Sequence, residues 1–186
     1  ATAPAPLPDT HHPSIYHKRI PIQIYRKHLL TRVTAPASEP VSVEDAKLYL
    51  RVDGSEEDTL IGDMIVAARL AAEDTLKRSL ITQSWKLAYD DYLPEMVYLP
   101  MGPVASVSSV TVVNRDTSTQ PISSDMYYLN AARDTLLLDS VLFGFRVEIV
   151  YATGYGGASS VPQPIRHGML AHIAALYDAR GVDAMV

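Results

Sequence analysis

Hydrophobic and polar positions change their spacing twice along the chain, and these changes separate helical parts from a β-rich part. Apolar residues recur every three or four positions in residues 42–80, alternate with polar residues in 82–151, and return to helical spacing in 162–179. The pattern predicts an α+β fold, in which two N-terminal helices and one C-terminal helix form a helical core. An antiparallel β-sheet or small sandwich is inserted between them.

The two N-terminal helices carry recognisable end signals. Ser42 followed by Asp45 resembles a capping box, with Asp in place of the usual Glu or Gln. We expect this first helix to end at the turn that Gly54 supplies, and the second to open at Ser55. The apolar face of the second helix is wider than one core needs, so part of it is predicted to contact a neighbouring subunit. That stripe consists of Leu60, Met64, Ala67 and Ala71.

Short strands follow, beginning with the segment around Trp85. Residues 127–130 and 135–139 are predicted to form a hairpin, and residues 146–151 alternate apolar and polar positions as a strand does. The sequence Gly154-Tyr-Gly-Gly then precedes the last helix. It lacks the lysine of a phosphate-binding loop, so we interpret it as a loop in which glycine supplies positive φ angles.

An extended arm, residues 1–39, precedes this folded part (residues 40–181), and residues 182–186 form a C-terminal tail. Ile20, Ile22 and Ile24 alternate with other residues, which predicts a short strand or an extended strip. Pro21 restricts such a strip to the edge of a sheet or to the surface of another element. The residues of the arm expected to make contacts are Ile20, Ile22, Ile24, Tyr25 and Arg26.

Charge is distributed unevenly between the arm and the body. The net charge of the whole chain is −5. Residues 1–37 hold five basic residues and one acidic residue, a net charge of +4. The remaining residues hold 11 basic and 20 acidic residues, a net charge of −9. A basic arm on an acidic body fits an arm that binds an acidic partner, whether protein or nucleic acid, and equally a solvated tail. No run of 18 apolar residues is present, so we expect no membrane partner.

The His and acidic residues show no spacing typical of a catalytic, cofactor-binding or metal site. The chain has no Cys, which excludes disulfides and thiolate ligands. His11 and His12 lie in the arm, and His167 and His172 are five positions apart on the last helix, so they do not share a face. The acidic clusters fall at predicted helix ends and loops, where solvation explains them. We therefore expect no enzyme, no cofactor and no metal.

The order and spacing of several short motifs resemble the head–tail connector, or adaptor, proteins of tailed bacteriophages and phage-like gene transfer particles. The matching segments, which cover about residues 40–180, are Pro40-Val-Ser-Val-Glu-Asp-Ala-Lys-Leu-Tyr-Leu-Arg-Val-Asp-Gly, Glu57-Asp-Thr-Leu-Ile, Leu80-Ile-Thr-Gln-Ser-Trp, Leu99-Pro-Met-Gly-Pro-Val-Ala-Ser-Val, Val150-Tyr-Ala-Thr-Gly-Tyr-Gly and Val161-Pro-Gln-Pro-Ile-Arg. The arm departs from the family pattern.

The resemblance implies a structural protein of the virion neck, made in the host bacterial cytoplasm. Family members assemble as a ring, usually of twelve copies, below the portal protein. The ring extends the channel for DNA, which passes without sequence-specific binding, and it seats the stopper or tail-completion protein. By analogy, the last helix and tail would contact the portal through Ile165, Met169, Ile173, Tyr177, Arg180 and Val186. Two alternatives stay open: another neck protein, such as a stopper, or a nucleic-acid-binding accessory protein that uses the basic arm.

Overall fold

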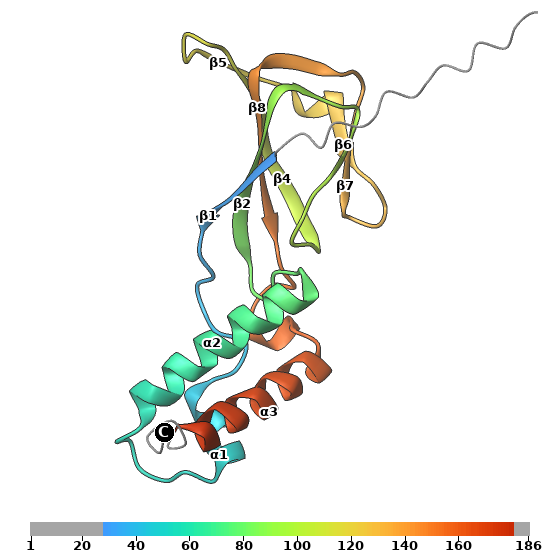
Figure 1. Ribbon diagram of the computed structural model, residues 1–186. Helices are drawn as coiled ribbons and strands as arrows, with labels where there is room; N and C mark the ends of the chain where they lie inside the picture. Colours follow the sequence, from blue (N-terminus) through green and yellow to red (C-terminus); the bar gives the residue numbers. More distant parts are fainter. Residues whose placement is uncertain (1–27, 181–186) are drawn as a thin grey trace, which may run out of the picture.

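The computed structural model describes residues 28–180, which form a helical lobe and a β lobe joined end to end (Figure 1). The α-helices of this part are α1 (Val43–Leu50), α2 (Asp58–Leu76) and α3 (Gln163–Ala179). The strands are β1 (His28–Thr34), β2 (Gln83–Leu93), β3 (Met96–Tyr98), β4 (Val104–Val113), β5 (Thr119–Pro121), β6 (Tyr127–Leu129), β7 (Thr135–Leu138) and β8 (Leu142–Thr153). The predicted α+β fold class is confirmed. None of the described helices combines the length and the apolar character needed to cross a membrane.

The ends of α1 and α2 follow from local hydrogen bonds. The Ser42 side chain accepts a hydrogen bond from the Asp45 backbone N–H at 3.0 Å, as the capping signal predicted. The C-terminal cap is Arg51, in the left-handed region with φ of 59°, so α1 ends at Leu50, before the turn at Gly54 that the sequence predicted. Its N–H bonds to the carbonyl of Lys47, which satisfies the end of the helix without a glycine. The α2 helix begins at Asp58, after a turn that includes Ser55.

The helical lobe has its own hydrophobic core. The inner faces of the three helices and the loops that flank them contribute apolar residues that are at most 3% exposed. These residues are Val41, Ala46, Ile61, Ile65, Ala68, Leu80, Ile81, Val161, Met169 and Ile173. The α2 and α3 helices lie side by side, and α1 packs across both (Figure 1).

The β lobe consists of two antiparallel sheets over a second core. The larger sheet has the strand order β1-β2-β8-β4-β5, and the smaller has the order β3-β7-β6. The predicted hairpin of residues 127–139 is the β6–β7 pair, in which Tyr128 lies opposite Leu137. Two sheets that bury their inner faces against each other form the small sandwich that the alternating pattern predicted.

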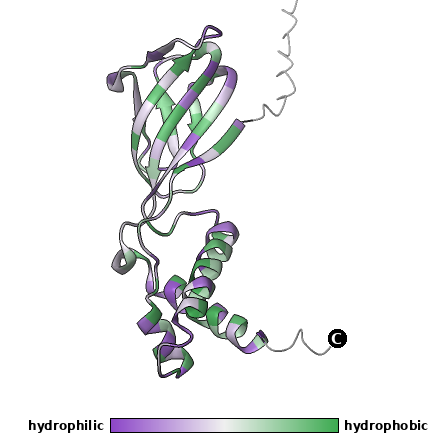
Figure 2. Ribbon diagram, turned by 90° about the vertical axis from the view of Figure 1, so that its left-hand side faces the viewer, coloured by the Kyte–Doolittle hydropathy of each residue, from purple (hydrophilic) through white to green (hydrophobic). Residues whose placement is uncertain are grey.

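Alternation along β2 and β8 explains which face is buried. Trp85 pairs with Tyr151 and Leu87 with Ile149, and these side chains all point into the core. Residues between them carry charge on the opposite face, as in the Lys86–Glu148 ion pair at 3.3 Å. Figure 2 shows the resulting change from hydrophobic to hydrophilic colour along the strands. Because side chains alternate with a period of two, a shift of one residue would expose this core.

The β1 strand lies in the segment that the sequence assigned to the arm. It pairs with β2 from His28, opposite Tyr89, to Thr34, opposite Ser84, so residues 28–34 are an edge strand of the larger sheet. Most β1 side chains are exposed, so neither face of this strand contributes much to a hydrophobic core. This weak hydrophobic alternation is the reason that the sequence pattern did not separate β1 from the residues before it.

The two lobes have separate hydrophobic clusters and meet at a polar junction. Glu73, near the end of α2, is 2% exposed and accepts hydrogen bonds from the Leu80 backbone N–H at 2.9 Å and from Gln83 Nε2 at 2.8 Å. Arg69 donates to Glu73 at 3.2 Å and to Glu39 at 2.7 Å. The junction thus ties α2 to β2 and to the segment that follows β1. Paired and hydrogen-bonded, these buried charges are satisfied.

The loop between β8 and α3 uses glycine as the sequence predicted. Gly154 has φ of 111° and Gly156 has φ of 120°, a region that residues with a side chain rarely adopt. The Gly154 backbone N–H bonds to the carbonyl of Pro103, and the Thr82 N–H bonds to the carbonyl of Gly156. The loop therefore passes close to the backbone that leads into β2.

Candidate interaction surfaces

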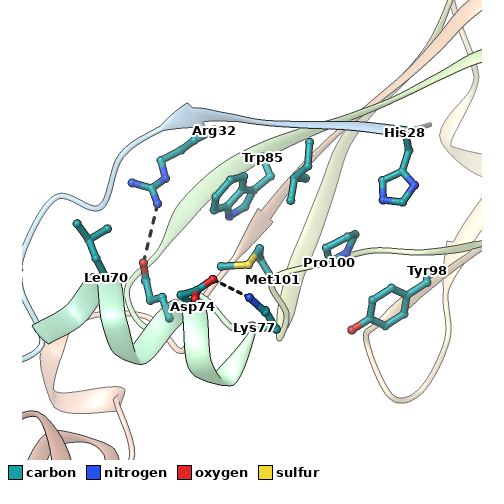
Figure 3. A pocket seen from close by; sticks show the side chains of 11 residues that line it. His28, Arg32, Leu70, Asp74, Lys77, Trp85, Tyr98, Pro100 and Met101 are labelled. Carbon is teal, nitrogen blue, oxygen red and sulfur yellow. Dashed lines mark hydrogen bonds and ion pairs between the residues drawn. The ribbon is translucent and has the colours of Figure 1, made fainter. Parts of the chain in front are cut away.

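A cleft of about 730 Å³ lies where the edge strand β1 passes the end of α2 (Figure 3). We call it the β1–α2 cleft. Its walls come from β1, α2, β2 and the segment between β3 and β4. The lining residues are His28, Leu30, Arg32, Leu70, Glu73, Asp74, Lys77, Trp85, Tyr98, Pro100 and Met101.

The middle of the cleft is apolar and contains the only Trp of the chain. Trp85 is 9% exposed, and its indole N–H donates to Ser79 Oγ at 3.1 Å, which fixes the ring. The guanidinium of Arg32 lies 5.0 Å from the centre of the Trp85 ring, within the range of a cation–π contact. Leu70 on α2 and Tyr98 on β3 are 44% and 61% exposed, so two large apolar side chains at the rim have little cover.

The wall opposite β1 is held by hydrogen bonds from the β lobe. The Tyr151 hydroxyl donates to the carbonyl of Pro100 at 3.0 Å, and burial raises the pKa of this phenol. The Ser79 backbone N–H donates to the carbonyl of Met101 at 3.0 Å. Pro100 and Met101 therefore stand at a fixed distance from the α2–β2 turn, and the width of the cleft is set by the fold.

Charged groups concentrate at the α2 end of the cleft. Arg32 lies 4.0 Å from Glu73, and Asp74 pairs with Lys77 at 2.6 Å (Figure 3). The Asp74–Lys77 pair is well exposed and contributes little stability. Burial acts to lower the pKa of Arg69, but the hydrogen bond to Glu39 and the charges of Glu39 and Glu73 outweigh it and raise that pKa. The net result is a charged end beside an apolar middle.

The free edge of β1 borders the cleft along its length. The strand pairs with β2 on one side, and no described strand pairs with the other. His28, Leu30 and Arg32 line the cleft, whereas Leu29 and Val33 are exposed on the opposite face of the strand. An unpaired edge with an adjacent apolar hollow is the arrangement that binds an extended peptide by strand addition. No trio of His, Asp or Glu side chains among the described residues is placed to hold a metal.

A second hollow, the α2–α3 groove of about 400 Å³, brings together residues from two predicted contact sets. Ala71, from the predicted inter-subunit stripe, and Ile165, from the predicted portal contact, both line it. Small residues, including Gly168, leave the groove open. Of the rest of the stripe, Leu60 and Ala67 are exposed and Met64 is half-buried.

The predicted portal residues on α3 divide into buried and accessible ones. Met169 and Ile173 are at most 2% exposed and fill the core of the helical lobe, because they lie on the face that packs against α2. In this conformation the two side chains therefore expose almost no surface, although Met169 borders the α2–α3 groove, and the portal contact stays a prediction. Val186 lies outside the described residues.

Tyr177 and Arg180 lie at the end of α3 and bind the start of α2. Both donate hydrogen bonds to Glu57, Arg180 at 2.7 Å, and the Arg180 guanidinium lies 3.5 Å from the centre of the Tyr177 ring. The hydrogen bond from Tyr177, together with that from Arg180 and its charge, outweighs burial and lowers the pKa of the Glu57 carboxyl. This cluster is accessible at the end of the helical lobe away from the sheets (Figure 1). The predicted arm contacts, Ile20, Ile22, Ile24, Tyr25 and Arg26, lie outside the described residues.

Comparison with protein families matches residues 40–127 to the model of the Phage gp6-like head-tail connector proteins. Over this stretch the chain is similar to the head–tail connector proteins. The match begins before α1 and reaches the start of β6, so it includes α2, β2 and β3, which form much of the β1–α2 cleft. The family resemblance predicted from the sequence is confirmed. No curated protein matches this chain.

Solved structures with the same fold come from gene transfer agent (GTA) particles. A chain from the neck of the empty GTA particle computed with C6 symmetry has a TM-score of 0.72, and the match covers 81% of this chain and 84% of that one. A chain from the virion of the native GTA particle gives 0.71, with 81% and 84% covered. One from the neck of the native particle computed with C12 symmetry gives 0.65, with 81% and 83% covered. Each is 24% identical to this chain, so these likenesses establish the fold alone.

The β lobe also has an exposed aromatic cluster that the sequence pattern did not predict. Both Phe residues of the chain are exposed at the start of β8, Phe143 at 74% and Phe145 at 47%. The guanidinium groups of Arg115 and Arg146 lie 5.8 and 5.9 Å from the Phe145 ring centre. A signal for this cluster was present in the sequence, because the alternation of apolar and polar residues in β8 continues through Phe143 and Phe145, beyond the residues that are buried in the core. The cleft gave no such signal, because its residues come from four separate segments.

Proposed function

We propose that the chain is a structural adaptor of a virion neck, assembled as a ring of twelve copies below the portal protein. The observation that carries this proposal is the family match over residues 40–127, joined to a fold shared along 81% of the chain with subunits of GTA necks. One of those necks was computed with C12 symmetry, which supports twelve copies. Connector proteins act by contact and not by catalysis, which suits a surface made of clefts and apolar faces.

The proposed portal contact is the end of α3 with the tail. Tyr177 and Arg180 are accessible there, and Ile165 lies half-buried in the α2–α3 groove. Neighbouring copies would meet along α2, where Leu60 and Ala67 are exposed. This assignment keeps the portal contact at one end of the molecule and leaves the β lobe, with Phe143 and Phe145, at the other for the stopper or tail-completion protein.

Ring closure needs two different surfaces on each subunit. A head-to-tail contact joins a patch on one copy to a different patch on the next, and it closes if the rotation between copies divides a full turn. The α2 face and the β1–α2 cleft are two such surfaces. Viral DNA would pass through the ring without sequence-specific binding, since an acidic body discourages adhesion of the DNA backbone.

Two experiments test the proposal. Negative-stain images of the protein assembled on its portal should show a ring, and an imposed twelve-fold average should sharpen it; a two-fold dimer would contradict the proposal. Removal of residues 179–186 should prevent attachment to the portal while the circular dichroism spectrum of the folded chain is retained. Normal attachment of that truncated chain would refute the portal contact assigned to α3.

A further inference from the structure

We propose that the β1–α2 cleft binds the Ile20–Ile24 strip of an adjoining copy, which adds as a strand to the free edge of β1. The inference rests on the proposed ring assembly and names the contact that links one copy to the next. It assigns a partner to a cleft whose apolar middle and unpaired strand edge have no occupant among the described residues.

The chemistry of the cleft fits an extended apolar segment. Strand addition supplies affinity through backbone hydrogen bonds and specificity through hollows that receive every second side chain. On β1 the residues that face the cleft are His28, Leu30 and Arg32, which are themselves every second residue. A strand added at the free edge of β1 would place its own alternate side chains beside these residues, on the cleft side of the sheet, where Leu70 and Tyr98 are exposed.

The strip has the matching sequence. Ile20, Ile22 and Ile24 are spaced by two, so in a strand all three point to one face. Pro21 between them lacks a backbone N–H, and an added strand at the edge of a sheet tolerates it. Burial of the three isoleucine side chains in the cleft would contribute favourable binding free energy, and the backbone hydrogen bonds of the added strand would add to it.

Charge is complementary at the ends of the strip and of the cleft. A pair of basic residues stands on each side of the strip, Lys18-Arg19 before it and Arg26-Lys27 after it. Acidic side chains lie near both ends of β1: Asp74, which pairs with Lys77, at the α2 end, and Asp90 of β2, which pairs with Arg146, just beyond the last β2 partner of β1. Opposite charges at both ends favour docking in one register.

The sequence between the strip and β1 favours an adjoining copy over the same chain. To fold back beside its own β1, the strip would need a tight turn through Tyr25, Arg26 and Lys27. Tight hairpin turns require positive φ and are dominated by Gly, Asn and Asp, none of which occurs there. A strip from one copy in the cleft of the next is a head-to-tail contact, the type that closes rings.

The absence of cysteine from the chain allows a direct test with full-length protein. Rings are assembled on the portal from an equal mixture of an Ile22→Cys variant and a tagged Leu70→Cys variant, then oxidised mildly and analysed on non-reducing gels. We expect a disulfide-linked heterodimer. The matched control replaces Ile22→Cys by Gln23→Cys, whose side chain would point away from the cleft, and the heterodimer yield should fall by at least about tenfold.

The outcomes separate this inference from the ring function. Rings that form without the 22–70 bond, or with equal yields from positions 22 and 23, would overturn the cleft assignment and leave the ring function standing. A double variant with Ile22→Cys and Leu70→Cys should give a ladder of linked copies; an internal bond within single chains would show instead that the strip folds back. Failure to form any ring on the portal would refute the ring function and this inference together.

Discussion

Glu73 is a buried carboxylate at the junction of the two lobes. Its carboxylate receives Leu80 N–H and Gln83 Nε2 on one oxygen and Arg69 on the other. Gln83 belongs to the start of β2, Leu80 to the turn between α2 and β2, and Arg69 to α2 itself. The pattern of apolar residues could not predict this role. The three partners lie four, seven and ten residues from Glu73, and their hydrogen bonds stabilise the fold because the carboxylate is buried.

We predict that Glu73→Gln destabilises the protein by about 3–5 kcal/mol, the cost of breaking a buried ion pair by removing one partner. Either orientation of the new amide places an NH₂ group against a donor, since every partner of Glu73 donates. Urea unfolding at neutral pH would measure the loss. Asp74→Asn is the control: this exposed neighbour pairs with Lys77, so its loss should cost less than about 1 kcal/mol. Equal effects of the two substitutions would argue against the junction.

A second residue-scale prediction concerns the glycines of the β8–α3 loop. A Cβ on Gly154 would stand 2.5 Å from the carbonyl oxygen of Ile81, and its φ of 111° is unfavourable for any side chain. Gly154→Ala should therefore lower the thermal unfolding temperature substantially, through about 1–3 kcal/mol of backbone strain in addition to the clash. Gly157→Ala, where nothing lies within 4 Å of the added Cβ, should change the temperature little. A neutral Gly154→Ala would show that the loop moves freely.

At the scale of elements, the sequence predicts helices and strands well where the spacing of apolar residues and the signals at the ends of the element indicate the same structure. The α1 start, the β6–β7 hairpin and the β2 and β8 strands all follow from local signals. The β1 strand does not, because it is an exposed edge whose stability comes from pairing with β2. For the same reason the β1–α2 cleft was not predicted: its walls are distant in sequence, and its strand wall was assigned to the arm.

The cap of α1 offers an element-scale prediction. Ser42→Ala removes the acceptor for the Asp45 N–H and should cost about 1 kcal/mol of unfolding free energy. Ser55→Ala is a suitable control, because the side chain of Ser55 caps neither helix and only its backbone carbonyl accepts a bond, from Asp58. Chemical denaturation of both variants would compare them. Matching losses would show that the N-terminal cap of α1 is unimportant.

The end of α3 should respond to pH through Glu57. The hydrogen bond from Tyr177, with the hydrogen bond and charge of Arg180, lowers the pKa of this carboxyl despite the opposing effect of burial. A group with a lowered pKa stabilises the folded state above its unfolded pKa, and the contribution is lost as pH falls through the lowered value. Amide-exchange protection in the last turn of α3 should therefore decrease over that acidic range. A Glu57→Gln variant should show no such step; an unchanged step would assign it to another group.

At the scale of the whole molecule, separate cores in the helical and β lobes suit a part that contacts different partners at its two ends (Figure 1). The sequence predicted the family and the α+β plan, because those depend on order and spacing along the chain. It did not predict which surfaces are accessible, and Met169 and Ile173 illustrate this: their helical spacing identified an apolar face, but the face belongs to the core. Exposure is a property of packing and became visible only in the folded chain.

The most direct test of the account is a subunit-resolved electron microscopy map of the intact particle neck. We predict a ring of this chain directly below the portal, with the end of α3 toward the portal and the β lobes pointing toward the tail. Density for the chain at any site other than the portal vertex, or a ring with the β lobes against the portal, would contradict it.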